Sequence, residues 1–302
     1  MDKKQNLLTS PQMTAPLLLL LTLLMLELGK NVLLSGDYND NLYFTASVMQ
    51  IAAYLFPCAL YYLLKHRRLA SPMLIEPVGM GSMLLILPVL LLLLSGTIMI
   101  KYFAYVGYGG TVSMSGYYSE LLSMSDNSIG VMVAVIILPA VCEEVLFRGV
   151  LMAEYRSLGS ANAVLMTALL FAMMHLSFGD FILNFGAGIL LGLVASATGS
   201  VISSIAVHAA ANAFALFGVD AYIRNTVLKC GTFFVGFVMI CIFAISLILT
   251  LIRLEHIYYR HAEKPPTDTI PPRSADNAAK VFFSPTFMLS IAAFILLTIY
   301  LG

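Results

Sequence analysis

The sequence predicts an all-α fold: a polytopic transmembrane helical bundle with eight or nine spans around a polar cavity inside the membrane. Of the 302 residues, 60% are hydrophobic and 11% are charged, whereas soluble domains average about 45–50% apolar and about 25% charged residues. The mean hydropathy is +0.92. Apolar stretches of about 20 residues, the length that crosses a bilayer, recur along the chain. Short polar motifs interrupt the central stretches, and these motifs predict the cavity.

Apolar stretches occupy most of the chain. As candidate spans we take residues 15–35, 42–64, 80–100, 129–148, 160–178, 181–198, 201–218, 231–252 and 284–301. The first stretch follows Lys3 and Lys4 and resembles a signal peptide. It is long, however, and no small-residue cleavage site followed by a soluble domain comes after it. We therefore expect a retained signal-anchor helix.

The motifs and the polar segments divide the chain into regions. We expect amino-terminal helices and loops over residues 1–128, a motif-bearing core over 129–218, and carboxy-terminal helices over 219–302. Within the last region, residues 253–283 are polar and include two Pro-Pro pairs, which predicts a cytosolic linker.

The basic residues predict the orientation of the chain, because cytoplasmic loops are enriched in Lys and Arg. Basic residues precede the first stretch and follow the second, fourth and eighth: Lys3, Lys4, Lys65, Arg67, Arg68, Arg148, Arg156, Arg253, Arg260, Lys264 and Arg273. These are alternate loops, so we expect an integral protein of the cell membrane with a cytoplasmic amino terminus. Lys101, Arg224 and Lys229 are exceptions. The formal net charge is zero, so nothing suggests a nucleic-acid partner.

The first motif is Glu143-Glu144-x-x-x-Arg148, in the fourth stretch. Glu144 and Arg148 are four residues apart and share a helix face, so they can form an ion pair. Glu143 lies about 100° further round the helix. We therefore assign Glu143 as a general base on water and Glu144 as its structural neighbour, although the reverse assignment stays open. The alternative is a charged cluster at the cytosolic edge of the membrane.

The other two motifs are Phe171-x-x-x-His175 and His208-x-x-x-Asn212. In each motif the two residues are one helical turn apart, and Asn212 is placed to orient His208 or to donate to an oxyanion. Taken singly, they could be an interfacial histidine and a polar clamp between helices. Taken together, a shared cavity is the better explanation, since each charged group costs roughly 2.5–3.5 kcal/mol at the bilayer centre.

The predicted helix ends place the motifs at different depths in the membrane. If a helix begins near residue 160 at the inner side, His175 lies about 22 Å from that side at 1.5 Å per residue. The two acids lie near the inner end of the stretch 129–148. The motifs can meet only if these bounds are wrong, for example if the fourth helix continues past Arg148 toward Tyr155.

The ordered set of motifs, with Phe147, Arg148 and Gly149 after the acids, resembles the CPBP family of CAAX-protease and bacteriocin-processing (Abi) proteins, which includes Rce1-type endopeptidases. The resemblance covers about residues 129–218. It implies an intramembrane endopeptidase in which Glu143 and His175 activate water, while His208 and Asn212 stabilise the oxyanion. Glu144, Arg148 and Phe171 would support these groups.

The resemblance leaves the cofactor open. Glu143, His175 and His208 could hold a zinc ion with one open position, whereas a carboxylate with an oxyanion hole needs no metal. We favour the metal-free mechanism. The expected partners are the lipid bilayer and a peptide or protein substrate, cut at the cytosolic face. The substrate's identity, its prenylation and the oligomeric state stay open.

Two other functions are compatible with the motifs. A non-catalytic immunity or resistance protein would bind a peptide without cutting it, although the intact motif set favours an enzyme. A transporter could use the same groups as a proton relay, but the inverted repeats typical of transporters are not visible. The HExxH motif of zincin-type intramembrane proteases is also absent from the sequence.

Overall fold

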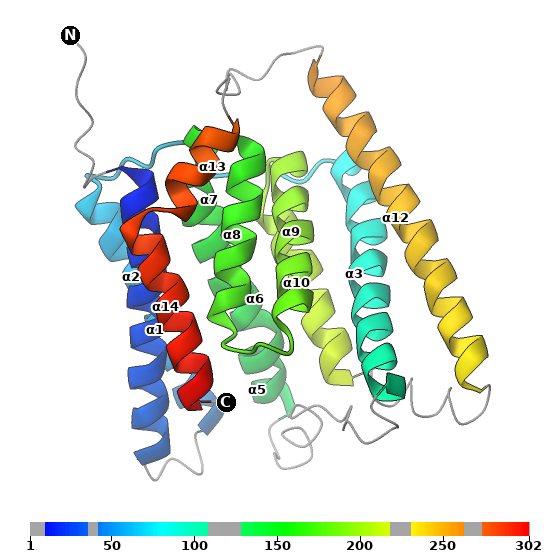
Figure 1. Ribbon diagram of the computed structural model, residues 1–302, viewed down its shortest axis with the longest axis horizontal. Helices are drawn as coiled ribbons and strands as arrows, with labels where there is room; N and C mark the ends of the chain where they lie inside the picture. Colours follow the sequence, from blue (N-terminus) through cyan, green and yellow to red (C-terminus); the bar gives the residue numbers. More distant parts are fainter. Residues whose placement is uncertain (1–9, 36–41, 108–127, 218–230, 263–273, 302) are drawn as a thin grey trace.

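The computed structural model describes residues 10–35, 42–107, 128–217, 231–262 and 274–301. Within these ranges every regular element is a helix, and the only β-type pairing is an isolated bridge between Ile75 and Ser200. The helices stand side by side as a bundle (Figure 1). The all-α prediction is therefore confirmed.

Long helices make up most of the bundle. These are α1 (Pro11–Ser35), α2 (Leu42–Leu64), α3 (Met80–Gly107), α9 (Phe181–Thr198) and α12 (Thr232–Ala262), with the shorter α8 (Ser160–Met174) and α10 (Val201–Phe217) inside, and α13 (Ser274–Phe282) followed by α14 (Pro285–Leu301). The predicted linker over residues 253–283 thus contains the last turns of α12 and the whole of α13. Of that linker, residues 263–273 lie outside the described residues.

The protein is an integral membrane protein, and its described residues contain fewer full-length spans than the sequence predicted. Among the described residues, six helical segments are long and apolar enough to cross a membrane, and the pair α13–α14, bent by 54°, makes a seventh if counted as one span. The apolar helices α8 and α10 are shorter. At 1.5 Å per residue, α8 measures about 22 Å, less than the roughly 30 Å of a hydrocarbon core.

The helix that carries the acids is longer than predicted. It runs without interruption through α5 (Ser128–Met132), η2 (Val133–Ile137), α6 (Leu138–Glu144), η3 (Val145–Leu151), α7 (Met152–Tyr155) and η4 (Arg156–Leu158). The bounds 129–148 were wrong at the inner end, because apolar and buried residues continue past Arg148. The acids therefore lie near the middle of a 30-residue span, and the disagreement about depth disappears.

Two segments of this helix, η2 and η3, are π-helical and flank the acids. Pro139 is the second residue of α6, which follows η2. Proline donates no backbone hydrogen bond and its ring clashes with the carbonyl four residues earlier, so the wider π turn accommodates it. Such π turns often occur at functional sites.

Glycines let α9 pack closely against α8. A Cβ atom at Gly188 would lie 2.8 Å from Ala168 Cα, and one at Gly192 would lie 3.2 Å from Val164 Cγ1. The spacing Gly-x-x-x-Gly is the usual pattern for close approach of membrane helices. This packing brings the backbone of α9 within reach of Arg148, as described below.

One end of the bundle is closed by the segment between α2 and α3. The buried carboxylate of Glu154 accepts hydrogen bonds from Lys65 Nζ at 3.3 Å and from the backbone N–H of Ala70 at 3.2 Å. Arg156 Nη1 donates to the carbonyl of Pro72 at 3.0 Å. Further along the segment, backbone bonds join Glu76 to Gly199 and Val201 to Leu74. We call this the basic end, since Lys65, Arg67 and Arg68 lie there.

Candidate active site

Glu144 and Arg148 form the buried centre of the site, and both side chains have no exposed area. Arg148 Nη1 donates to Glu144 Oε1 at 2.7 Å, the pairing that the i, i+4 spacing predicts. Arg148 Nη2 donates to the carbonyl of Gly188 at 2.9 Å. Arg148 therefore links the acid-bearing helix to α9 through its second nitrogen.

His208 lies beside the same carboxylate. Its Nδ1 atom is 2.9 Å from Glu144 Oε1, so the second acid holds the histidine of the third motif. The sequence had offered Asn212 as the residue that orients His208. In the structure Asn212 Nδ2 donates to the carbonyl of Ile136 at 3.5 Å instead.

The Phe171 ring joins the three motifs. Its centroid is 4.8 Å from the Arg148 guanidinium carbon, 4.8 Å from the His175 ring and 5.8 Å from the His208 ring. The ring faces the cation, an arrangement favoured by the aromatic quadrupole. A residue predicted only as supporting thus fixes the relative positions of both histidines and the arginine.

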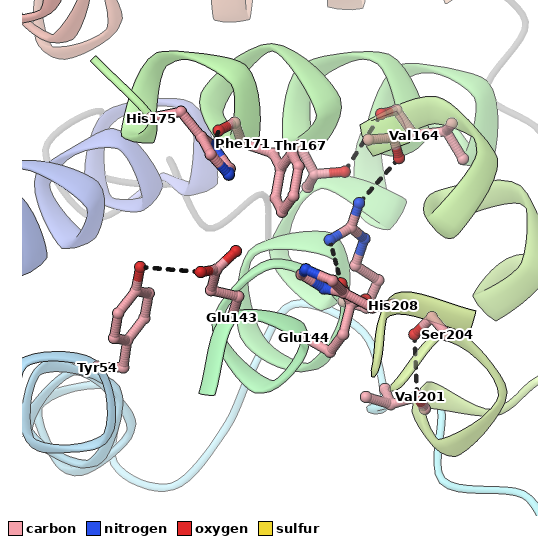
Figure 2. A network of polar contacts seen from close by, with 12 residues as sticks. Tyr54, Glu143, Glu144, Val164, Thr167, Phe171, His175, Val201, Ser204 and His208 are labelled. Carbon is pink, nitrogen blue, oxygen red and sulfur yellow. Dashed lines mark hydrogen bonds and ion pairs between the residues drawn. The ribbon is translucent and has the colours of Figure 1, made fainter. Parts of the chain in front are cut away.

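His175 lies directly after the last residue of α8, and the chain turns sharply behind it because Leu176 has a φ of 47°. The Nδ1 atom of His175 is 2.9 Å from the carbonyl oxygen of Phe171. In Figure 2 the ring extends toward the carboxylate of Glu143. The side chain is exposed, unlike those of Glu144 and Arg148, so a water molecule can reach it.

Glu143 points away from Glu144, as the 100° rotation requires (Figure 2). Its Oε1 atom accepts a hydrogen bond from the Tyr54 hydroxyl at 3.5 Å. Its Oε2 atom is buried and has no hydrogen-bond partner among the described residues. A buried carboxylate oxygen normally has a partner, so Oε2 is suited to hold a water molecule.

A cavity of about 280 Å³ opens beside these groups. Its wall includes Phe171, His175, His208 and Asn212, together with Lys101 from α3, Asn184 from α9 and Asp180 just before α9. The two acids do not line it. Both histidines therefore line the cavity, whereas Glu143 lies outside its wall and is bonded to Tyr54.

The three residues offered as zinc ligands do not fit a metal site. Among the described residues, no group of three or more His, Cys, Asp and Glu side chains is arranged to hold a metal ion. His208 is oriented by Glu144, and Glu143 faces the other way. We derive no catalytic step through a metal.

Comparison with known families extends these observations. A family model described as type II CAAX prenyl endopeptidase Rce1-like matches residues 125–214. This segment is therefore similar to Rce1-like endopeptidases. The match includes all three motifs and confirms the resemblance to the CPBP, Rce1-type family. No curated protein and no solved structure gave a significant match. The similarity to this family supports a protease-type function at a membrane.

Two residues at the Rce1-like site were not identified from the sequence. Tyr54 reaches Glu143 from α2, and Gly188 offers its carbonyl to Arg148 from α9. The Gly-x-x-x-Gly spacing of Gly188 and Gly192 was a usable signal for close helix packing. No pattern in the sequence distinguishes Tyr54 from the other tyrosines of α2.

Proposed function

We propose that the protein is an intramembrane endopeptidase that hydrolyses peptide bonds of membrane-associated peptides or proteins. The observation that carries the proposal is the meeting of all three motifs around Phe171, with both histidines on one cavity. The family match supports a hydrolase of the CAAX-protease type. All the apolar helices, including the short α8 and α10, would lie in the bilayer and bring the spans to eight or nine around this cavity.

The reaction begins with water held between Glu143 and His175. Glu143 takes a proton from the water, and the resulting hydroxide attacks the carbonyl carbon of the peptide bond. The carbonyl oxygen becomes negative, and N–H groups of His208 and Asn212 donate hydrogen bonds to it. The carbon–nitrogen bond then breaks, and the abstracted proton passes to the leaving amine through Glu143 or His175.

Glu144 and Arg148 position the catalytic groups without touching the substrate. The 2.7 Å ion pair keeps Glu144 in place, and Glu144 fixes the His208 ring through Nδ1. This leaves Nε2 of His208 for the substrate side, where it donates an N–H to the oxyanion when the ring carries both protons beside the Glu144 carboxylate. A hydrogen bond to the other ring nitrogen holds a histidine in one orientation. Catalysis requires this, because the reacting atoms must be placed to within a fraction of an ångström.

A non-catalytic immunity or resistance protein is the second candidate. It would use the same cavity to bind a peptide, and the position of Glu143 outside the cavity wall is the observation that favours it. In that case both histidines would be binding groups, and no water would be activated.

The deciding experiment measures peptide cleavage by purified protein in lipid vesicles, wild type against Glu143→Gln. Because general-base catalysis contributes about 10²–10⁴-fold, we expect a rate loss of that size. Glu255→Gln, the same change at an exposed position of α12, is the matched control and should retain full activity. Farnesylated CaaX peptides, leader peptides and membrane-protein segments serve as substrates.

A strong chelator added to the same assay tests the metal-free mechanism, which predicts no effect on the rate. Equal rates for wild type and Glu143→Gln would reject Glu143 as the base. Peptide binding without cleavage of any substrate would favour the immunity-type function.

The proposed location is the cell membrane, with the amino terminus in the cytoplasm. The carboxy-terminal turns of α2 and α12 reach the same end of the bundle (Figure 1). The alternate basic loops of the sequence would therefore all lie on the cytoplasmic side.

A further inference from the structure

The helices that line the catalytic cavity contribute mainly residues that are remote from the basic end. Helix α3 starts just after the closing segment, and it contributes residues 93–101 from its later part. Helices α9 and α10 meet at Gly199 and Val201, which bond to that segment. Their contributions, residues 183–191 and 208–215, lie away from this junction.

Among the described residues, none that lines the cavity belongs to the closing segment at the basic end. Glu154 binds Lys65 and Ala70, and the closing segment continues to Gly199 and Val201 through backbone hydrogen bonds. At the opposite end, His175 and Asp180 are exposed and line the cavity. The mouth therefore lies at the end remote from the basic loops.

Lys101 was an exception to the charge pattern, since it lies on the non-cytoplasmic side of the predicted topology. It lines the cavity together with Asn184 and Asn212. The rule that cytoplasmic loops are enriched in Lys and Arg concerns how a chain inserts into the membrane. A lysine that lines a binding site is not subject to this rule. The position of Lys101 therefore agrees with a substrate site on that side.

A second cavity, of about 300 Å³, lies against the first between α3, α9 and α12. Both cavities share the residues Leu93, Thr97, Leu183 and Ala187. The rest of the second wall is apolar, and Ile182 and Ile100 there are 78% and 43% exposed. In a bilayer this cavity faces lipid, so an apolar chain can reach the histidines sideways from the membrane.

We infer that the substrate is a membrane-anchored polypeptide that enters from the half of the bilayer opposite the basic, cytoplasmic loops. Its apolar segment lies between α3 and α9, and its cleavage site lies beside His175. This inference rests on the proposed function for the cutting step, and it reverses the expectation of cleavage at the cytosolic face.

The first test of the inference measures which side of the membrane the cavity opens to, and it needs no activity. Asp180→Cys and, one turn further, Asn184→Cys are treated with a membrane-impermeant maleimide in right-side-out and inside-out vesicles. Arg68→Cys, at the basic end, is the matched control, and the wild-type cysteines give the background. We expect Asp180→Cys to react only in right-side-out vesicles and Arg68→Cys only in inside-out vesicles.

Reaction of Asp180→Cys or Asn184→Cys from the same side as Arg68→Cys would overturn the inference. So would failure of both cavity positions to react from either side while the control reacts. Wild type that cuts no peptide, with the expected labelling, would reject the proposed protease and leave the sidedness of the cavity standing.

The second test concerns entry between α3 and α9. A Cβ atom at Gly186 would meet no atom within 4 Å, and neither would one at Gly81. Gly186→Leu fills the apolar cavity, whereas Gly81→Leu makes the same change outside it. We expect Gly186→Leu to slow cleavage of a membrane-anchored substrate at least tenfold and to spare a short soluble peptide. Equal rates for the two variants on the anchored substrate would overturn the sideways entry.

Discussion

The stability of the buried site depends strongly on the ion pair between Arg148 and Glu144. Arg148→Ala would leave Glu144 as a buried carboxylate beside His208 alone, and breaking a buried ion pair costs about 3–5 kcal/mol. We expect a clearly lower thermal midpoint in detergent. Arg68→Ala, at an exposed position, should change the free energy of unfolding by no more than about 0.5 kcal/mol. Equal midpoints would contradict the structural importance of the pair.

At the residue scale, the sequence predicts contacts within a helix far better than contacts between helices. The Glu144–Arg148 pair follows from a spacing of four residues, and it is present at 2.7 Å. The bond between Tyr54 and Glu143 joins residues 89 positions apart. Nothing local determines which tyrosine of α2 faces the acids, because that depends on how α2 packs. The same is true of His208: its ring is oriented by Glu144, whereas the sequence suggested Asn212.

The packing of α9 on α8 gives a prediction at the scale of elements. Gly188→Ala would place Cβ 2.8 Å from Ala168 Cα, and overpacking costs about 1–3 kcal/mol. Gly186→Ala, two residues earlier on the same helix, meets open space and should stabilise by up to about 1 kcal/mol, because alanine favours helix. Thermal unfolding in detergent measures the midpoint of each of the two variants. A midpoint for Gly188→Ala equal to that of Gly186→Ala would contradict the close packing.

The bounds of the helices were only partly predictable. Hydropathy located each apolar stretch, but the acid-bearing helix continues to Leu158 because a buried Glu154 and a buried Tyr155 extend it. The sequence alone does not show that Glu154 is buried, because its partners Lys65 and Ala70 lie in another segment. Likewise, α8 ends at Met174 and not near residue 178, because the chain turns at Leu176.

At the scale of the whole molecule, composition alone predicts the class of protein, and the three motifs predict where its chemistry lies. The direction from which the cavity opens was not predictable. It depends on which half of α3, α9 and α10 faces the cavity, and each of these helices is apolar along its length. The basic loops indicate only which end of the bundle is cytoplasmic. The contacts of residues 65–79 add that this end is closed.

The closed basic end has a kinetic consequence. With the basic end closed, the membrane-anchored fragment of a cut peptide must leave sideways between α3 and α9, by the route that brought the substrate in. We therefore expect the longer, membrane-anchored fragment to act as a competitive inhibitor and to make product release slow relative to chemistry. Progress curves that slow early, and slow more when the purified fragment is added at the start, would show this. Linear curves unaffected by added fragment would mean that the products leave by a second route.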